Sequence, residues 1–191
     1  MDIREVVFNN RSYTPIPLIL IVLILASPTW PAFLLGLGIA LLGEMLRIWG
    51  VSHAGSATRT TSGAGGDDLI TSGPFAYVRN PLYLGNFLIT IGFTVASWAW
   101  MPWMLILVIL LFGIQYWLII SLEEEYLSQH FGYKYQLYKN HVGRFLPRMV
   151  PWPDRDPRSG NWRAALRSEK STLTSFVTFA LVLWLRWKLF S

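Results

Sequence analysis

The chain has 191 residues, of which 53% are hydrophobic and only 14% are charged, and its mean hydropathy is +0.39. An average soluble domain carries roughly 25% charged residues, so this composition excludes a water-soluble globule and an intrinsically disordered chain. The net charge of +5 suits a membrane surface with anionic lipid heads, and no nucleic-acid partner is expected. The chain has no cysteine, which excludes disulfides, thiolate metal sites and cysteine nucleophiles.

The hydropathy pattern predicts helices that cross a bilayer. The apolar stretches, in chain order, are 13–27, 31–50, 81–97, 102–121 and 171–190. A helix needs about 20 apolar residues to cross a bilayer core of about 30 Å, and the last four stretches meet or approach that length. The first stretch is too short to cross alone, so we expect it to form a hairpin with the second, turning at Pro28 and Pro31. The sequence therefore predicts an all-α, polytopic integral membrane protein with about five transmembrane helices.

The positions of lysine and arginine predict the orientation of these helices. The turns after the first and third apolar stretches contain none, whereas segment 51–80 holds Arg59 and Arg79 and segment 123–170 holds nine. By the positive-inside rule the two charged segments face the cytoplasm. This places the N-terminus and a catalytic rim on the cytoplasmic side and the C-terminus on the opposite side. The mixed charges around the N-terminal stretch favour a retained anchor over a cleaved signal peptide.

Three segments between or beside the apolar stretches have compositions typical of connections. Residues 54–68 are rich in Gly, Ser, Thr and Ala and are predicted to be a linker. Residues 149–160 contain three prolines among charges and are predicted to be an extended surface connection. Residues 161–170 are predicted to form a short interfacial helix.

Polar sequence is concentrated in two segments on the predicted cytoplasmic side. The first reads T-S-G-P-F-A-Y-V-R-N-P-L-Y-L-G at 71–85, and the second runs from E-E-E-Y-L at 123–127 to V-G-R-F-L-P at 142–147. Helices 81–97 and 102–121 are joined by a tight turn, so their far ends should lie close together. We therefore expect Arg79, before the first helix, to meet Glu123 and Glu124, which end the second.

These two segments resemble the integral-membrane methyltransferases that include isoprenylcysteine carboxyl methyltransferase and the phospholipid N-methyltransferases. The family pattern is G-P-[YF]-x-Y-x-R-H-P-x-Y-x-G, a hydrophobic helical hairpin, then E-E-x-x-L-x-x-x-F-G-x-x-Y-x-x-Y-x-x-x-V-P, and a final proline. The resemblance covers about residues 37–148. The matching residues are Gly73, Pro74, Phe75, Tyr77, Arg79, Pro81, Tyr83, Gly85, Glu123, Glu124, Leu127, Phe131, Gly132, Tyr135, Tyr138, Val142 and Pro147.

Two positions depart from the family pattern. Asn80 stands where the family has histidine, and Gly143 stands where it has proline. An asparagine side chain can still donate and accept hydrogen bonds, but it cannot act as a titrating base.

The resemblance implies an S-adenosylmethionine-dependent methyltransferase domain over residues 1–170, followed by an additional transmembrane helix at 171–191. S-adenosylmethionine presents a sulfonium cation, an adenine, a ribose diol and an amino acid zwitterion. Carboxylates, an arginine and aromatic rings are suitable partners for these groups. The residues that the resemblance assigns to the cofactor are Tyr77, Arg79, Asn80, Pro81, Tyr83, Gly85, Glu123 and Glu124.

The chemistry of the acceptor decides which residues take part in catalysis. A carboxylate is already ionised at neutral pH and needs no general base, only a cation such as Arg144 or Arg47 to hold it. An amine must first lose a proton, which His53 or Glu124 would have to accept. We therefore favour a lipophilic carboxylate acceptor of the prenylcysteine type, with Arg144, His53 and Glu124 as candidate catalytic residues.

Three alternatives remain open at this stage. The first is N-methylation of a phospholipid amine. The second is an NADPH-dependent membrane reductase that resembles the steroid reductases, and the third is a non-catalytic membrane scaffold. No Asp/Glu/His triple stands at ligand spacing, so no metal site is predicted.

Overall fold

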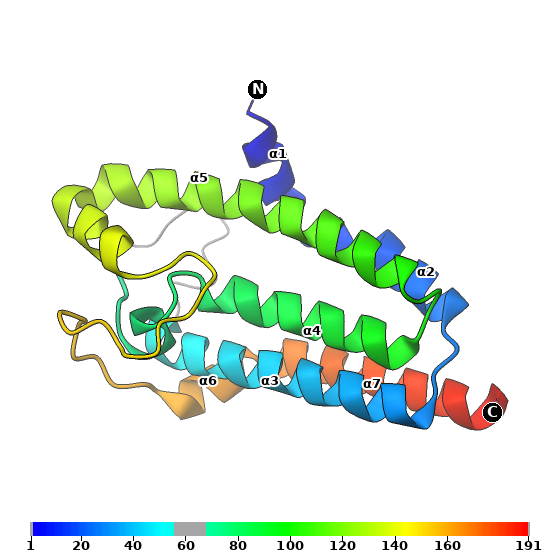
Figure 1. Ribbon diagram of the computed structural model, residues 1–191. Coiled ribbons are helices and arrows are strands. Elements are labelled where there is room, and N and C mark those ends of the chain that lie inside the picture. Colours follow the sequence, from blue (N-terminus) through cyan, green and yellow to red (C-terminus); the bar gives the residue numbers. More distant parts are fainter. Residues whose placement is uncertain (1, 56–67, 191) are drawn as a thin grey trace. The chain divides into compact units, whose positions relative to one another are not determined.

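The computed structural model describes residues 2–55 and 68–190, and over these residues the protein is built from helices (Figure 1). In chain order they are α1 Ile3–Asn9, α2 Pro15–Leu25, α3 Trp30–Ala54, the 3-10 helix η2 Gly73–Ala76, α4 Pro81–Ser97, α5 Trp103–His141, α6 Trp162–Ser168 and α7 Lys170–Phe190. The described residues contain no strand, only an isolated bridge between Val78 and Gly143. The predicted all-α membrane fold class is confirmed. Most of the predicted linker at 54–68, including Arg59, lies outside the described residues.

Three of these helices, α3, α5 and α7, are long and apolar enough to cross a membrane. Helices α2 and α4 are apolar but shorter, with 11 and 17 residues. At 1.5 Å per residue, an 11-residue helix extends only about 17 Å, roughly half of the bilayer core. A total of five membrane spans therefore stays a prediction.

Proline and hydropathy together determine where most helices begin and end. Pro81 opens α4, where its missing N–H and fixed φ suit the first helical turn. The predicted bounds 81–97 agree with α4, and 171–190 differs from α7 by one residue. The short helix expected within 161–170 is present as α6. Helix α1 was not predicted; it starts at the N-cap Asp2, whose side chain accepts from the Arg4 N–H.

The prediction that a helix ends at Glu123 and Glu124 was wrong, because α5 continues to His141. The residues after position 121 are hydrophilic, but glutamate, leucine and glutamine are good helix formers. Polarity therefore ends the lipid-facing part of α5 without ending the helix. The backbone departs from helical geometry at Gly132, with φ 51° and ψ −125°, values that glycine adopts without steric cost.

The chain divides into two compact units, and α3, α4 and α5 contribute residues to both. Unit 1 comprises Met1–Glu44, Asn86–Ile119 and Ser171–Ser191, and unit 2 comprises Met45–Gly85 and Ile120–Lys170.

In unit 1, α3 and α4 pack closely through small residues. A Cβ at Gly92 would lie 2.6 Å from the backbone oxygen of Gly36, so neither helix has room for a side chain there. Helix α7 runs along α3 (Figure 1), and the rings of Trp30 and Trp187 stack with centroids 5.0 Å apart. The buried core of unit 1 contains Ala26, Phe33, Ala40, Phe93, Ala96, Phe176 and Leu183.

The two lysine-free turns of unit 1 are hydrogen-bonded to each other. The Ser27 N–H donates to the Ser97 oxygen at 2.9 Å, and the Ser27 hydroxyl donates to the Trp98 oxygen at 3.2 Å. Arg186 of α7 reaches the same end, where its Nε and Nη2 donate to the Ala26 and Ile24 oxygens at 2.6 and 2.8 Å. These carbonyls follow or end α2, so the arginine caps a helix C-terminus.

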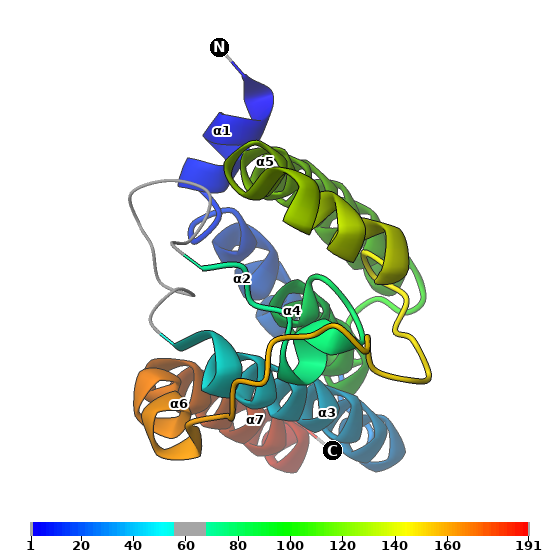
Figure 2. The same cartoon turned by 90° about the vertical axis from the view of Figure 1, so that its left-hand side faces the viewer.

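Unit 2 is held together by the chain that follows α5. Figure 2 shows this segment passing across the residues that precede α4. The Trp152 N–H donates to the Ala76 oxygen, and the Arg148 N–H donates to the Tyr77 oxygen, both at 2.9 Å. The predicted extended connection at 149–160 is thus partly anchored, with Trp152 only 4% exposed. The buried core of unit 2 contains Leu69, Tyr135, Tyr138, Val142 and Trp152.

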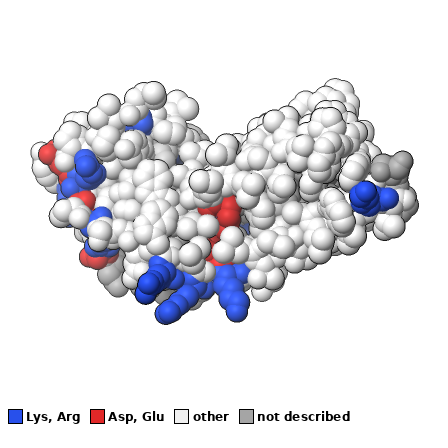
Figure 3. Space-filling view, turned by 90° about the horizontal axis from the view of Figure 1, so that it is seen from below, with Lys and Arg blue, Asp and Glu red and all other residues white. Residues whose placement is uncertain are grey.

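Charged side chains are unevenly distributed over the sequence and the surface. Segments 12–43, 86–119 and 171–185 contain no Lys, Arg, Asp or Glu. Many of their large apolar side chains are nevertheless exposed, such as Leu35 at 62% and Leu110 at 56%. The face in Figure 3 accordingly has wide uncharged areas between groups of charges. Such exposed apolar surface is suited to lipid rather than to water.

Candidate active site

The centre of the candidate site is the carboxylate of Glu124 in α5, which is only 3% exposed. Its Oε1 accepts from Arg79 Nε at 2.9 Å and from Asn80 Nδ2 at 3.3 Å. Its Oε2 accepts from Arg144 Nε at 3.1 Å and from Arg144 Nη2 at 2.5 Å. Both oxygens of the buried carboxylate are therefore paired, as burial of a charge requires.

Arg79 connects this carboxylate to the chain beyond α5. Its Nη1 donates to the oxygens of Lys139 and Val142 at 2.9 and 2.5 Å, and its backbone N–H donates to the Gly143 oxygen at 2.9 Å. The expected approach of Arg79 to Glu124 is thus present. The side chain lies between Glu124 and the last carbonyls of the helix, which attract a cation.

Gly143 explains how the chain reaches Arg79. A Cβ at this position would lie 2.6 Å from the Leu146 oxygen, so the turn after Val142 leaves no room for a side chain. Glycine at this position, where the family has proline, therefore fits the local backbone. Tyr138, near the end of α5, also binds the segment that precedes α4, because its hydroxyl donates to the Phe75 oxygen at 2.7 Å.

A second pair lies one residue before Glu124. The Tyr83 hydroxyl donates to Glu123 Oε1 at 2.7 Å, and both side chains are half-buried. Tyr83 stands in the first turn of α4, three residues after Asn80. The beginning of α4 therefore contacts both adjacent carboxylates of α5, through Asn80 to Glu124 and through Tyr83 to Glu123.

These contacts indicate different chemical roles for the two carboxylates. Two guanidinium groups stabilise the ionised form of Glu124, which makes it a poor acceptor of a proton from an ammonium group. Glu124 is suited to fix Arg79 and Arg144 in place. Glu123 accepts a hydrogen bond from the neutral Tyr83 hydroxyl and is half-buried, so its carboxylate is suited to bind a ligand.

The arginines predicted to hold an acceptor carboxylate both have carboxylate partners within the protein. Arg144 directs Nε and Nη2 at Glu124, and its Nη1 lies 3.4 Å from the Ser121 hydroxyl. Arg47 of α3 pairs with Glu169 at 2.5 Å, next to the end of α6. A bound carboxylate would have to share these donors or displace the present partner. The sequence pattern did not predict the pairing of Arg47 with Glu169, which lies 122 residues further along the chain.

His53 is held by a different group of residues in the same unit. A Cβ at Gly73 would lie 2.6 Å from its ring, and a Cβ at Gly160 would lie 2.9 Å from it. Its Nδ1 lies 3.0 Å from the Ser52 hydroxyl and 3.2 Å from the Trp49 oxygen. The ring is thus packed between two backbone segments, and these contacts support the fold of unit 2.

Three further residues that the resemblance assigned to the cofactor shape the backbone around the site. Pro81 and Gly85 are buried in the first turns of α4. Tyr77 packs its ring against Trp49, with centroids 5.9 Å apart, and its backbone oxygen accepts from Arg148. Among residues 2–55 and 68–190, no group of three His, Asp or Glu side chains is placed to hold a metal ion.

The comparison with protein families decides the classification of this fold and site. The model of the phospholipid methyltransferase family matches residues 31–134, which is more than half of the chain. The chain belongs to the phospholipid methyltransferase family. The predicted membership in the integral-membrane methyltransferases is thereby confirmed. Comparisons with curated proteins and with solved structures find no significant match.

Membership in the phospholipid methyltransferase family implies methyl transfer to lipid-like substrates in a membrane. The matched range contains Arg79, Asn80, Tyr83 and both carboxylates. It ends before Arg144, although Arg144 donates to Glu124 as closely as Arg79 does. The matched range therefore includes the residues at the start of α4 and in α5 that contact each other. It does not include the segment that contributes Arg144 to the cluster around Glu124.

Proposed function

We propose that this chain transfers a methyl group from S-adenosylmethionine to a lipid-like acceptor, at a site formed by the Glu123 and Glu124 region of α5 and the beginning of α4. The observation that carries this proposal is the buried cluster of Arg79, Glu124 and Arg144 beside the Tyr83–Glu123 pair. Burying a cluster of charges has a high desolvation cost, and perturbed charge clusters are concentrated at functional sites. Its main contacts lie within the region that matches a methyltransferase family.

The donor groups of the site fit the polar parts of S-adenosylmethionine. The carboxylate of Glu123, positioned by Tyr83, would accept hydrogen bonds from the ribose diol or from the ammonium group. Glu124 would keep Arg79 and the start of α4 in register with Glu123. When bound, the cofactor supplies an activated methyl group on a sulfonium ion. The protein contributes mainly alignment, which is a large effect in displacement reactions.

We propose a carboxylate on a lipophilic molecule as the acceptor. Glu124 is paired with two arginines, and His53 is packed among Gly73, Gly160 and Ser52, so neither is set up as a general base. A carboxylate is ionised at neutral pH and needs none. Transfer to it from a sulfonium ion removes two opposite charges, and a site shielded from water favours that loss of charge.

Cofactor binding is the first test. Isothermal titration of the detergent-purified protein with S-adenosylhomocysteine should show one site, and Glu123→Gln should weaken binding by about tenfold or more, since a hydrogen bond to a charged group contributes about 1.5–3 kcal/mol. Glu125→Gln is the matched control, because Glu125 is the adjacent glutamate and is exposed. No heat from the wild type at millimolar ligand, while the protein is folded by circular dichroism, would contradict the proposal.

The acceptor is identified by the stability of the labelled product. Membranes that contain the protein are incubated with S-adenosylmethionine labelled in its methyl group, and the lipid extract is then treated with base. A methyl ester releases labelled methanol, whereas a methylated amine retains the label. Label that resists base would overturn the carboxylate proposal, and recovery of that label in the amine of a phospholipid head group would establish the alternative of phospholipid amine methylation.

Two alternatives from the sequence predict different ligands or none. A reductase of the steroid-reductase type would bind NADPH instead of S-adenosylhomocysteine in the same titration. A scaffold would keep its cellular function after Arg79, Glu123 and Glu124 are replaced.

We also propose that the N-terminus and the site face the cytoplasm and that α7 is a span added after the family core, ending on the other side. The hydrogen bonds between the two lysine-free turns support a common side for these turns. Because the chain has no cysteine, single cysteines can be introduced and labelled. In intact cells an impermeant maleimide should label Thr29→Cys and not Ser159→Cys, both exposed positions. Labelling of Ser159→Cys and not of Thr29→Cys would show the opposite orientation in the membrane.

A further inference from the structure

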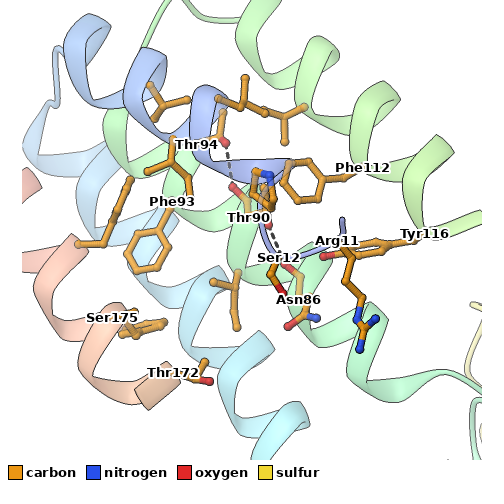
Figure 4. Close-up of a pocket in the computed structure, with 18 residues that line it drawn as sticks. Arg11, Ser12, Asn86, Thr90, Phe93, Thr94, Phe112, Tyr116, Thr172 and Ser175 are labelled. Carbon is orange, nitrogen blue, oxygen red and sulfur yellow. Dashed lines mark hydrogen bonds between the residues drawn. The ribbon is translucent and has the colours of Figure 1, made fainter. Parts of the chain in front are cut away.

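Unit 1 contains a cavity of about 360 Å³, and all of the residues that line it belong to unit 1. It is lined by residues from the α1–α2 connection and from α2, α4, α5 and α7 (Figure 4). Small-molecule sites usually have volumes of about 300–1,000 Å³. This cavity is near the lower limit, which suits one hydrocarbon chain rather than the two chains of a phospholipid.

The cavity has an apolar part formed by aromatic and aliphatic side chains. Phe93 of α4 lies against Phe176 and Phe179 of α7, with ring centroids 4.8 and 4.7 Å apart. Thr94 of α4 directs its hydroxyl group back onto its own helix. The Thr94 hydroxyl donates to the Thr90 oxygen at 2.8 Å, so it is satisfied within the helix. This part of the cavity offers contacts to hydrocarbon.

The opposite end of the cavity is polar. Figure 4 shows Arg11, Ser12, Asn86 and Tyr116 together at this end, with Phe93 and Thr94 away from them. Among the described residues that line the cavity, Arg11 alone carries a charge. Arg11 precedes α2, so the polar end lies beside the beginning of an apolar helix, where a membrane interface is expected.

Arg11 is held in place but retains donors for a ligand. Its Nη1 donates to the Phe8 oxygen at 2.8 Å, and its guanidinium carbon lies 4.0 Å from the centroid of the Phe8 ring. A guanidinium has five N–H donors and binds carboxylate or phosphate groups well. Both contacts to Phe8 orient the side chain, and they use only one of the five donors.

We propose that this cavity binds one hydrocarbon chain of an anionic lipid, with the carboxylate or phosphate head group on Arg11. Arg11 at the polar end is complementary in charge to an anionic head group. The phenylalanine-lined part is complementary to hydrocarbon, and the cavity volume suits one hydrocarbon chain. Ten of the eighteen lining residues come from positions 11–22 and 172–179, outside the range that matches the family model. More than half of the lining therefore lies outside the range that the family model matches.

The proposal is tested by native mass spectrometry of the detergent-purified full chain, without any methyl donor, so that it is independent of methyl transfer. The ligands are oleate, its neutral counterpart oleyl alcohol, and oleoyl lysophosphatidate. We expect one bound oleate or lysophosphatidate per chain and at least about tenfold weaker binding of the alcohol, because a charge-assisted hydrogen bond is lost. The tighter of the two anions identifies whether the head group is a carboxylate or a phosphate.

Two pairs of variants test the two ends of the cavity. Arg11→Gln should reduce oleate binding to the level of the alcohol, whereas Arg4→Gln, in the same N-terminal region and outside the lining, should not. Ile19→Trp should block the chain, whereas Ile21→Trp should not. Ile19 lines the cavity and Ile21 does not, although they are similarly exposed, at 42% and 45%, in the same helix.

Three results would overturn the proposal. They are equal binding of oleate and the alcohol by the wild type, unchanged oleate binding by Arg11→Gln, and equal effects of the two tryptophan variants. Circular dichroism of each variant separates loss of binding from loss of fold, because these exposed or half-buried positions are expected to tolerate replacement.

Discussion

Arg79 donates from Nε to Glu124 Oε1 at 2.9 Å, although 45 residues separate them in the chain. The contact joins the residue two positions before α4 to the middle of α5. It also brings in Arg144, whose Nη2 donates to the other oxygen of the same carboxylate. One buried charge thus fixes three chain segments, and its removal should affect all of them.

Replacement of Glu124 by glutamine should destabilise the protein by about 3 kcal/mol, because removing one partner of a buried ion pair leaves uncompensated charge. Glu124, Arg79 and Arg144 have side-chain exposures of 4%, 9% and 22%, so the loss should be only partly screened by water. The measurement is thermal unfolding in detergent. The matched variant Glu125→Gln should unfold like the wild type. If Glu124→Gln and Glu125→Gln shift the unfolding midpoint equally, the cluster of Arg79, Glu124 and Arg144 does not stabilise the fold.

Replacement of Tyr83 by phenylalanine should separate binding from stability. The change removes the hydroxyl that donates to Glu123 and leaves the ring in place. We expect the affinity for S-adenosylhomocysteine to fall by about tenfold at most, with little change in the unfolding midpoint. Tyr126→Phe, at an exposed tyrosine of α5, is the control. A large loss of stability in Tyr83→Phe would instead assign the hydroxyl to the support of the fold.

Replacement of Gly73 by alanine should be destabilising for two reasons. Gly73 has a φ of 57°, and an added Cβ would lie 2.6 Å from the His53 ring. The left-handed backbone alone costs an alanine about 1–2 kcal/mol. Gly132→Ala is a reference for an alanine at positive φ without a clash, because Gly132 has a φ of 51° and nothing within 4 Å of its Cβ position. The clash itself is measured by a double-mutant cycle: Gly73→Ala should cost less unfolding free energy in the His53→Ala background than in the wild type.

The sequence allowed correct prediction of the features that depend on hydropathy and proline. The bounds of α4 and the start of α3 followed from apolar length and from Pro81 and Pro31. The approach of Arg79 to Glu124 followed from the tight turn between α4 and α5, since two adjacent antiparallel helices bring their far ends together.

Other features depend on contacts that a linear pattern does not contain. The continuation of α5 past Glu124 was missed because hydropathy reports contact with lipid rather than helix formation. The donation from Arg144 to Glu124 depends on the turn at Gly143, and the pairing of Arg47 with Glu169 depends on where α6 ends. The role of Arg186 was also hidden, because a basic residue near the C-terminus becomes a helix cap only once the Ile24 and Ala26 carbonyls are placed beside it.

The pH dependence of stability provides a last test, at Asp156 in the connection between α5 and α6. Burial raises the pKa of Asp156, but hydrogen bonds from the backbone N–H groups of Arg158 and Thr71 outweigh it and hold the pKa below its ordinary value of 3.8. The folded state thus favours the ionised form. Its contribution to stability is complete at neutral pH and is lost as the pH falls below about 3.8 through the folded-state pKa.

Replacement of Asp156 by asparagine should therefore destabilise the protein at pH 7 and have a smaller effect near pH 3. The expected loss at pH 7 is about 0.5 kcal/mol, because the carboxylate is only half-buried and is screened by solvent. Thermal unfolding of wild type and variant at both pH values gives the difference, in which the contributions of all other carboxylates cancel. Asp154→Asn, at a nearby exposed aspartate, is the matched control for the removal of one negative charge from this connection. A difference between wild type and Asp156→Asn that grows toward low pH would show that the folded state favours the protonated form, opposite to the hydrogen bonds from Thr71 and Arg158.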